Sequence, residues 1–74
     1  MKDFGFEWAL SQLKLGASVY RNGWNGEKMF LSIQVPDRES KMSLPYIYIK
    51  TEDGERVPWI ASQTDLLSSD WQQL

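Results

Sequence analysis

The segment RNGWNG, residues 21–26, gathers side chains that could bind a flat, negatively charged ligand. Trp24 could stack on a ring such as adenine, and base–aromatic stacking contributes about 1–3 kcal/mol. Asn25 could pair with an adenine edge through two hydrogen bonds. Arg21 and Lys28 flank the loop and could reach phosphate oxygens. The alternative, that Trp24 simply fills the core beneath two tight turns, is equally open, because tryptophan is highly buried on average.

A second polar segment, SQTD, lies at the expected start of a helical turn. Its backbone N–H groups could meet an anion, and its carboxylate could hold ribose hydroxyls. Plain capping of the turn explains the same residue types and is the favoured interpretation. The residues concerned are Ser62, Gln63, Thr64 and Asp65.

The groups that most enzymes use for acid–base or covalent catalysis are missing. The chain has no histidine and no cysteine, so the commonest general base, a thiol nucleophile and a Ser-His-Asp arrangement are excluded. The sequence contains neither of the glycine-rich phosphate-binding motifs, G-x-x-x-x-G-K-S/T and G-x-G-x-x-G. Two carboxylate pairs remain, Asp65 with Asp70 and Glu52 with Asp53, and the second pair is expected in a solvated turn. We therefore expect a protein that is not an enzyme and needs no metal or cofactor.

The length of the chain predicts one domain, residues 1–74, with a small core. A core of this size supplies only about 3–5 kcal/mol, and small proteins compensate with disulfides, metals or partners. The lack of cysteine and histidine excludes disulfides and a typical zinc site. We therefore expect a homo-oligomer. The four tryptophans support this expectation, since so many indoles in a short chain suggest that some face an interface or a ligand.

Net charge and the absence of long apolar stretches limit which partners and which location can be expected. With a formal net charge of -2, the protein lacks the basic excess that binds polymeric nucleic acid, but a small phosphorylated ligand is not excluded. Asp3 and Glu7 interrupt any apolar stretch at the N-terminus, so a signal peptide is not expected. No run approaches the roughly 18 apolar residues of a membrane span. We expect a cytoplasmic protein with no membrane partner.

A helix is predicted over residues 3–15, with Asp3 as its N-cap and Gly16 just beyond its end. Trp8 lies off the centre of its apolar stripe, so it would cover a rim or a partner subunit. The stripe follows the spacing of one helical face and consists of Phe6, Ala9, Leu10 and Leu13.

Strands and turns fill most of the remaining chain. The two Asn-Gly dipeptides predict turns with positive φ at Gly23 and Gly26, and Gly54 does the same in the hairpin turn 51–54. Pro58 cannot donate to a ladder, which places its strand at an edge or a bulge. Residues 36–43 read as an exposed, mobile loop. The predicted strands are 18–21, 29–35, 46–50 and 55–60.

The C-terminal segment is predicted to begin with a short helical turn near Asp65, capped by Ser62 or Thr64. Leu66 and Leu67 are expected to anchor that turn to the core. Trp71 then packs in a final extended segment. The fold class is α+β: one N-terminal helix packed on a small, mainly antiparallel sheet.

Two stretches, residues 21–31 and 44–71, resemble the second class of phage Thoeris anti-defence proteins. The resemblance rests on R-x-G-W-N-G followed downstream by P-W-x-A-S-Q-T-D and D-W, behind an N-terminal amphipathic helix. Each piece alone is weak, but the combination is specific and covers nearly the whole chain apart from the loop at 36–43.

The resemblance implies a function that composition could not. Such proteins act as sponges that bind the cyclic ADP-ribose signal of bacterial Thoeris defence without degrading it. They are homotetramers with pockets between protomers, and some relatives also hold cyclic oligonucleotides at separate sites. The alternatives from other classes are a protein–protein interaction module with an aromatic surface, and a nucleotide hydrolase using Asp65 or Asp70.

The resemblance also implies which residues line the pocket. Trp24 would stack on the ligand base, supported by Arg21, Gly23 and Asn25. The segment 62–65 would line the other side from a neighbouring subunit; its members are Ser62, Gln63, Thr64 and Asp65.

Overall fold

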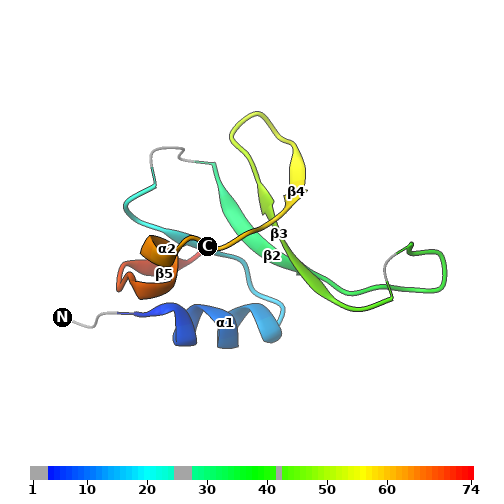
Figure 1. The fold of residues 1–74 in the computed structure, drawn as a ribbon, viewed down its shortest axis with the longest axis horizontal. Helices are drawn as coiled ribbons and strands as arrows, with labels where there is room; N and C mark the ends of the chain where they lie inside the picture. The colour runs from blue at the N-terminus through cyan, green and yellow to red at the C-terminus, as the bar shows by residue number, and fades with distance from the viewer. Residues whose placement is uncertain (1–3, 25–27, 42) are drawn as a thin grey trace.

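A five-stranded antiparallel sheet carries the strands in the order β4-β3-β2-β1-β5. Figure 1 shows the sheet with helices α1 and α2 beside it. The computed structural model describes residues 4–24, 28–41 and 43–74, so Asp3, Asn25 and Gly26 lie outside the described residues. The predicted α+β class is confirmed. The elements are α1 (Phe6–Lys14), β1 (Val19–Arg21), β2 (Phe30–Gln34), β3 (Tyr46–Lys50), β4 (Arg56–Pro58), α2 (Gln63–Leu67) and β5 (Trp71–Gln73).

Helix α1 is shorter than the predicted range 3–15, but Gly16 terminates it as predicted. Its first residue is Phe6, so the predicted start at residue 3 was wrong. The N-cap is Gly5, which has no side chain to cap the helix. At the other end Gly16 has a φ of 94°, and its N–H donates to the Leu13 carbonyl at 3.0 Å. The Ala17 N–H reaches the Gln12 carbonyl at 3.0 Å, which completes a Schellman motif. The helix therefore stops at the glycine that the sequence indicated.

The hairpins of the sheet follow the alternation of the sequence. β3 has the predicted bounds and pairs with β2 along its whole length, from Gln34↔Tyr46 to Phe30↔Lys50. Gly54, with a φ of 91°, turns the chain between β3 and β4. Pro58 lies in β4, which forms one edge of the sheet, as the missing N–H of proline requires.

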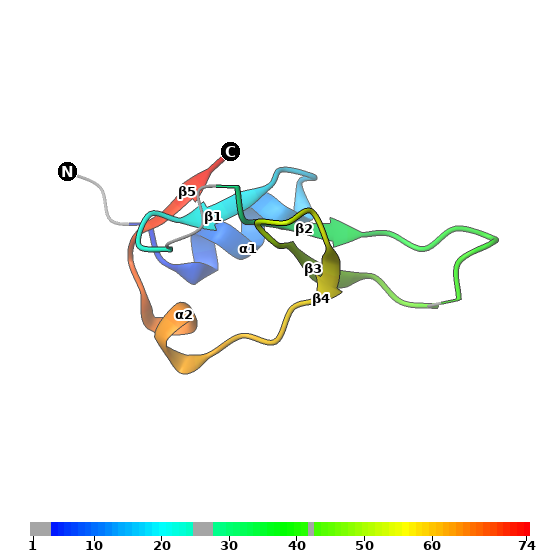
Figure 2. The same ribbon diagram turned by 90° about the horizontal axis from the view of Figure 1, so that it is seen from above.

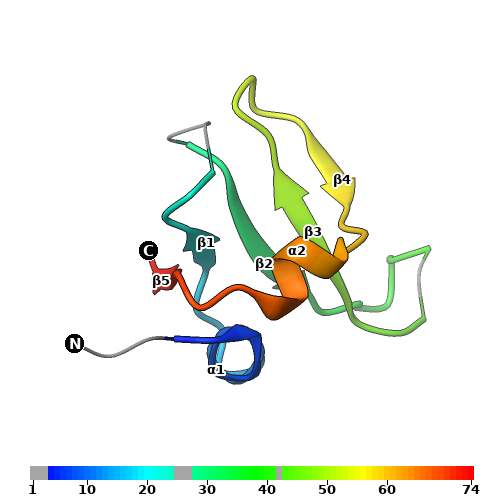
Figure 3. The same ribbon diagram turned by 60° about the vertical axis from the view of Figure 1, so that its left-hand side comes forward.

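The chain then returns to the opposite edge of the sheet. In Figure 2 the segment containing α2 leads back from β4 to β5, which pairs with β1 from Val19↔Gln73 to Arg21↔Trp71. Helix α1 packs against β1, β2 and β5, and Figure 3, in which it is seen nearly end-on, shows it next to β1 and β5. This return places the C-terminal strand beside the residues that follow β1.

Trp71 is the centre of the core. Its side chain is fully buried, and its Nε1 donates to the Asp65 carbonyl at 3.1 Å. The rings of Phe6, Trp24 and Trp59 meet it at tilted or edge-on angles. The predicted packing of Trp71 in an extended segment is thus confirmed. The remaining buried side chains are those of Ala9, Leu13, Val19 and Leu31.

The predicted anchoring of α2 by its two leucines was wrong. Leu66 is 43% exposed and Leu67 is 83% exposed. Helix α2 is instead held through Asp65, whose carbonyl accepts from Trp71 and whose carboxylate accepts from Arg21. A five-residue helix attached through polar bonds leaves its apolar side chains outside the core of the chain.

Replacing Trp71 with alanine is expected to unfold most of the protein. Truncation of a buried aromatic residue costs about 3–5 kcal/mol, which is comparable to the whole stability of a domain with one small core. Far-ultraviolet circular dichroism during urea titration would show the loss. Gln73→Ala, at an exposed position in the same strand, is the control. A Trp71→Ala protein with the wild-type urea midpoint would contradict the prediction.

Candidate functional site

Four of the expected ligand contacts come together where β1 ends and α2 begins. Arg21 is the last residue of β1, and its Nη1 donates to Asp65 Oδ1 at 2.9 Å. Its Nε donates to Asp70 Oδ1 at 2.8 Å. Gly23 and Trp24 follow directly in the chain. We call Arg21, Gly23, Trp24, Asp65 and Asp70 the Arg21 cluster.

Asp70 binds the segment that follows β1 at several points. Its Oδ2 accepts from the Gly23 N–H at 2.9 Å, and its carbonyl accepts from the Asn22 N–H at 3.0 Å. From the sequence, Asp70 was a candidate only as half of a carboxylate pair with Asp65. Because 49 positions separate it from Arg21, no local pattern could have linked the two.

Residues 21–24 form a turn, but not of the predicted kind. The Trp24 N–H donates to the Arg21 carbonyl at 3.1 Å, whereas among the described glycines only Gly16 and Gly54 have positive φ. The positive φ predicted at Gly23 was therefore wrong. The space at Gly23 matters for another reason: a Cβ there would lie 2.9 Å from Asp70 Oδ2. A side chain at this position would displace the carboxylate.

Trp24 packs on the core and also keeps an exposed surface, so neither of the two interpretations of it, core residue or stacking platform, is excluded. Its ring is half-buried and meets Trp71 edge-on, with centroids 5.5 Å apart and planes at 79°. Its Nε1 donates to Asp65 Oδ1 at 3.3 Å. The indole thus packs on the core and is held at its polar end, while part of it stays exposed. Stacking of a ligand on that part remains a prediction.

The segment 62–65 caps α2, as the favoured interpretation of it predicted. The Ser62 hydroxyl accepts from the Asp65 N–H at 3.1 Å, and the Asp65 carboxylate points to Arg21 and Trp24. Gln63 and Thr64 are exposed in the first turn of the helix. Asp65 therefore joins the Arg21 cluster, whereas Gln63 and Thr64 face outward; their roles as ligand contacts also remain predictions.

The charges of the Arg21 cluster stabilise one another. Hydrogen bonds to Asp70 and then to Asp65 raise the pKa of Arg21. The bond from Arg21 holds the pKa of Asp70 below its ordinary value. Burial opposes ionisation of Asp65, but bonds from Arg21 and then Trp24 outweigh it and lower its pKa. A general acid that works near neutral pH needs a raised pKa, and neither carboxylate has one.

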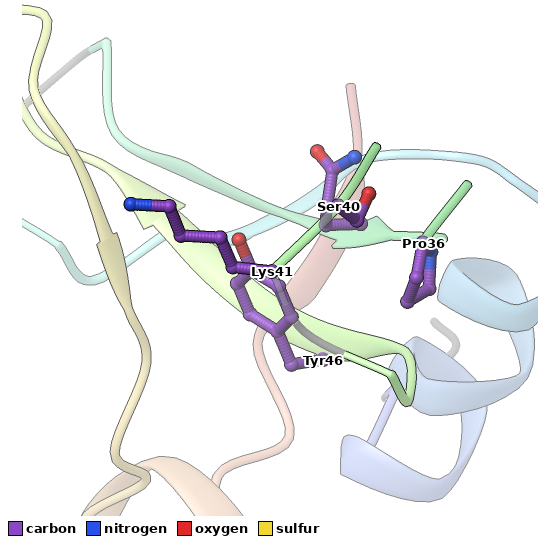
Figure 4. A pocket seen from close by; sticks show the side chains of 5 residues that line it. Pro36, Ser40, Lys41 and Tyr46 are labelled. Atoms are coloured by element: carbon purple, nitrogen blue, oxygen red, sulfur yellow. The ribbon is translucent and has the colours of Figure 1, made fainter. Parts of the chain in front are cut away.

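A small cleft lies apart from the Arg21 cluster. A cleft of about 230 Å³ between the ends of β2 and β3 is lined by Gln34, Pro36, Ser40, Lys41 and Tyr46, four of which are labelled in Figure 4. Within residues 4–24, 28–41 and 43–74, no group of acidic residues is arranged to hold a metal ion. No helix in the same ranges is long and apolar enough to cross a membrane.

The Arg21 cluster is expected to make stability depend on acid pH. Because the folded pKa values of Asp65 and Asp70 are lowered, their contribution is full above the unfolded carboxyl pKa, about 3.9, and is lost as pH falls through the folded values. Urea midpoints measured from pH 7 to pH 2 should therefore fall less steeply in Asp65→Asn/Asp70→Asn than in the wild type. Asp53→Asn is the control, and equal slopes in all three proteins would contradict the prediction.

Comparison with known proteins places the whole described chain in one family. The family model described as Tad2-like, a Thoeris anti-defense 2-like domain, matches residues 4–74. The protein Thoeris anti-defense 2 of Bacillus phage SP01 is 40% identical over an alignment length of 76, and the alignment covers 85% of each chain. The match runs from the residues before α1 through β5 and includes the whole Arg21 cluster. The resemblance seen in the sequence is confirmed: this chain belongs to the Thoeris anti-defense 2-like family.

Proposed function

We propose that this protein is a phage anti-defence protein that sequesters a cyclic ADP-ribose-type signalling nucleotide in the host cytoplasm without degrading it. Its family supports an action against Thoeris defence. The observation that carries the ligand proposal is the position of Trp24, half-exposed and held at its indole N–H beside Arg21. An aromatic ring next to a guanidinium suits a nucleobase linked to phosphate.

Preformed geometry supports binding without chemistry. Trp24 is fixed by Trp71 on one side and by Asp65 on the other, so little ordering would be needed when a ligand arrives. A sequestering protein needs affinity alone. The carboxylates of the Arg21 cluster, with lowered pKa values, fit a role in which they hold side chains in place.

The Arg21 cluster keeps polar groups for a ligand. Among the described residues, Arg21 uses three of the five N–H groups of a guanidinium, through Nε, Nη1 and Nη2. Asp65 uses Oδ1 for both Arg21 and Trp24, and within the same ranges its Oδ2 accepts no hydrogen bond. The remaining N–H groups suit a phosphate, and Oδ2 suits a ribose hydroxyl. Lys28, exposed beyond the turn, adds positive charge.

Exposed apolar side chains support assembly into a homo-oligomer, which we propose to be a tetramer. Ile60 is 90% exposed, and Leu67 is 83% exposed. Both lie in or beside α2, which also carries the outward-facing Gln63 and Thr64. A neighbouring copy that covers this surface would bring segment 62–65 to a pocket shared between protomers.

The proposal is tested by retention of the ligand. Purified protein is incubated with cyclic ADP-ribose and its isomers, free ligand is removed, and the protein is heat-denatured. Release of intact nucleotide supports sequestration, and release of an altered nucleotide would favour a hydrolase. With no nucleotide retained the proposal fails, which would favour the alternative, a protein-interaction module.

Trp24→Ala is expected to abolish retention while the oligomer persists, because the stacking platform is lost but Trp71 still fills the core. Retention is measured by mass spectrometry of the released nucleotide, and assembly by light scattering. Tyr48→Ala removes an aromatic ring from β3, outside the Arg21 cluster, and should retain the ligand as the wild type does. An unfolded or monomeric Trp24→Ala protein would show instead that Trp24 has a structural role.

Leu67→Asp is expected to reduce the molar mass measured by light scattering, because an ionised carboxylate in an apolar interface is strongly disfavoured. Leu44→Asp is the control, since Leu44 is 73% exposed but lies in the loop between β2 and β3. An unchanged mass for Leu67→Asp would place the interface elsewhere.

A further inference from the structure

We propose that Asp70 is a positioning residue, which holds residues 21–24 in the conformation that presents Trp24 to the ligand. Asp70 acts through Arg21 and Gly23 and need not touch the ligand itself. The inference rests on the proposed function, because it assigns to Asp70 a part of the affinity of that site.

Asp70 binds three consecutive residues of the segment with three of its atoms. Oδ1 accepts from Arg21 Nε at 2.8 Å, and Oδ2 accepts from the Gly23 N–H at 2.9 Å. Its carbonyl accepts from the Asn22 N–H at 3.0 Å. The turn is closed by the bond from the Trp24 N–H to the Arg21 carbonyl. The path of the chain into Trp24 is therefore set by one residue from the other end of the sequence.

Asp70 is itself firmly placed. It directly precedes Trp71, which is fully buried, and it forms a bridge with Phe4. The Trp71 N–H donates to the Phe4 carbonyl at 3.2 Å. The backbone of Asp70 is thus fixed by the core and by the segment before α1. Such an anchor can hold a surface turn in one conformation.

Gly23 gives an independent sign that the contact shapes the turn. Its φ is not positive, so backbone conformation does not call for glycine. A Cβ there would lie 2.9 Å from Asp70 Oδ2 and 3.4 Å from Arg21 Nη2. The absence of a side chain at residue 23 is what lets the carboxylate reach the backbone.

Asp65 and Asp70 have different tasks in this arrangement. Asp65 contacts the Trp24 indole directly, through Nε1. Asp70 bonds to the backbone before Trp24 and to Arg21. Without Asp70, the segment would sample other conformations and would have to be ordered during binding, which lowers affinity. A residue that merely stabilised the fold would lower the melting temperature without this local effect.

The experiment compares Asp70→Ala and Asp70→Asn with the wild type and with Glu39→Gln, which removes one negative charge from the exposed loop after β2. Calorimetry gives the Kd for cyclic ADP-ribose and its isomers at a temperature where each protein is folded. Amide hydrogen exchange is followed at Gly23, and at Leu31 in the core.

We expect Asp70→Ala to weaken binding about tenfold or more, which corresponds to about 1.4 kcal/mol. Exchange should become faster at Gly23, whose N–H loses its acceptor, and stay unchanged at Leu31. Asp70→Asn keeps an acceptor oxygen and should recover part of the affinity. Glu39→Gln should match the wild type.

Unchanged affinity in Asp70→Ala, or exchange accelerated equally throughout the chain, would overturn the inference. If the wild type binds no probe, the proposed function fails, and the positioning role is judged by hydrogen exchange alone. Unchanged exchange at Gly23 in Asp70→Ala then overturns the positioning role, and faster exchange there supports it. If Asp70→Ala does not fold, Gly23→Ala displaces the same carboxylate, and wild-type affinity in that variant overturns the inference.

Discussion

The guanidinium of Arg21 is shared between two carboxylates, and much of the architecture depends on this arrangement. Asp65 belongs to α2 and Asp70 precedes β5, so one side chain at the end of β1 fixes both parts of the C-terminal segment. Half-buried charges are tolerated because each is paired and hydrogen-bonded. Helix α2, whose leucines lie outside the core, depends on this attachment. Its position follows from electrostatics more than from burial of apolar surface.

The site and the core are parts of one structure. Trp71 fills the centre of the core and also provides the edge against which Trp24 rests. Asp65 accepts from Trp71 through its backbone and from Trp24 through its carboxylate. A small domain buries little apolar surface, and here the same tryptophans stabilise the fold and frame the proposed ligand surface. Rigidity at the surface is therefore a direct result of packing beneath it.

Local patterns predicted what local physics decides. Alternation gave the bounds of β3, Gly16 marked the end of α1, and Pro58 indicated an edge strand. The failures have tertiary causes. Gly23 donates its N–H to a carboxylate 47 positions away, and Leu67 stays exposed because α2 is attached through polar bonds of Asp65. The sequence named most members of the site but could not reveal that they bind one another.

The pairing of β1 with β5 has a consequence for how the protein forms. Val19 lies opposite Gln73, so the residues between them, about three quarters of the chain, form a loop that must close before this ladder exists. Closing such a loop costs entropy that only the late contacts recover, which slows folding. A chain caught before closure exposes its Asn-Gly-Trp segment with neither acidic partner in place. The proposed capture of a ligand therefore depends on the same cooperative step that completes the native state.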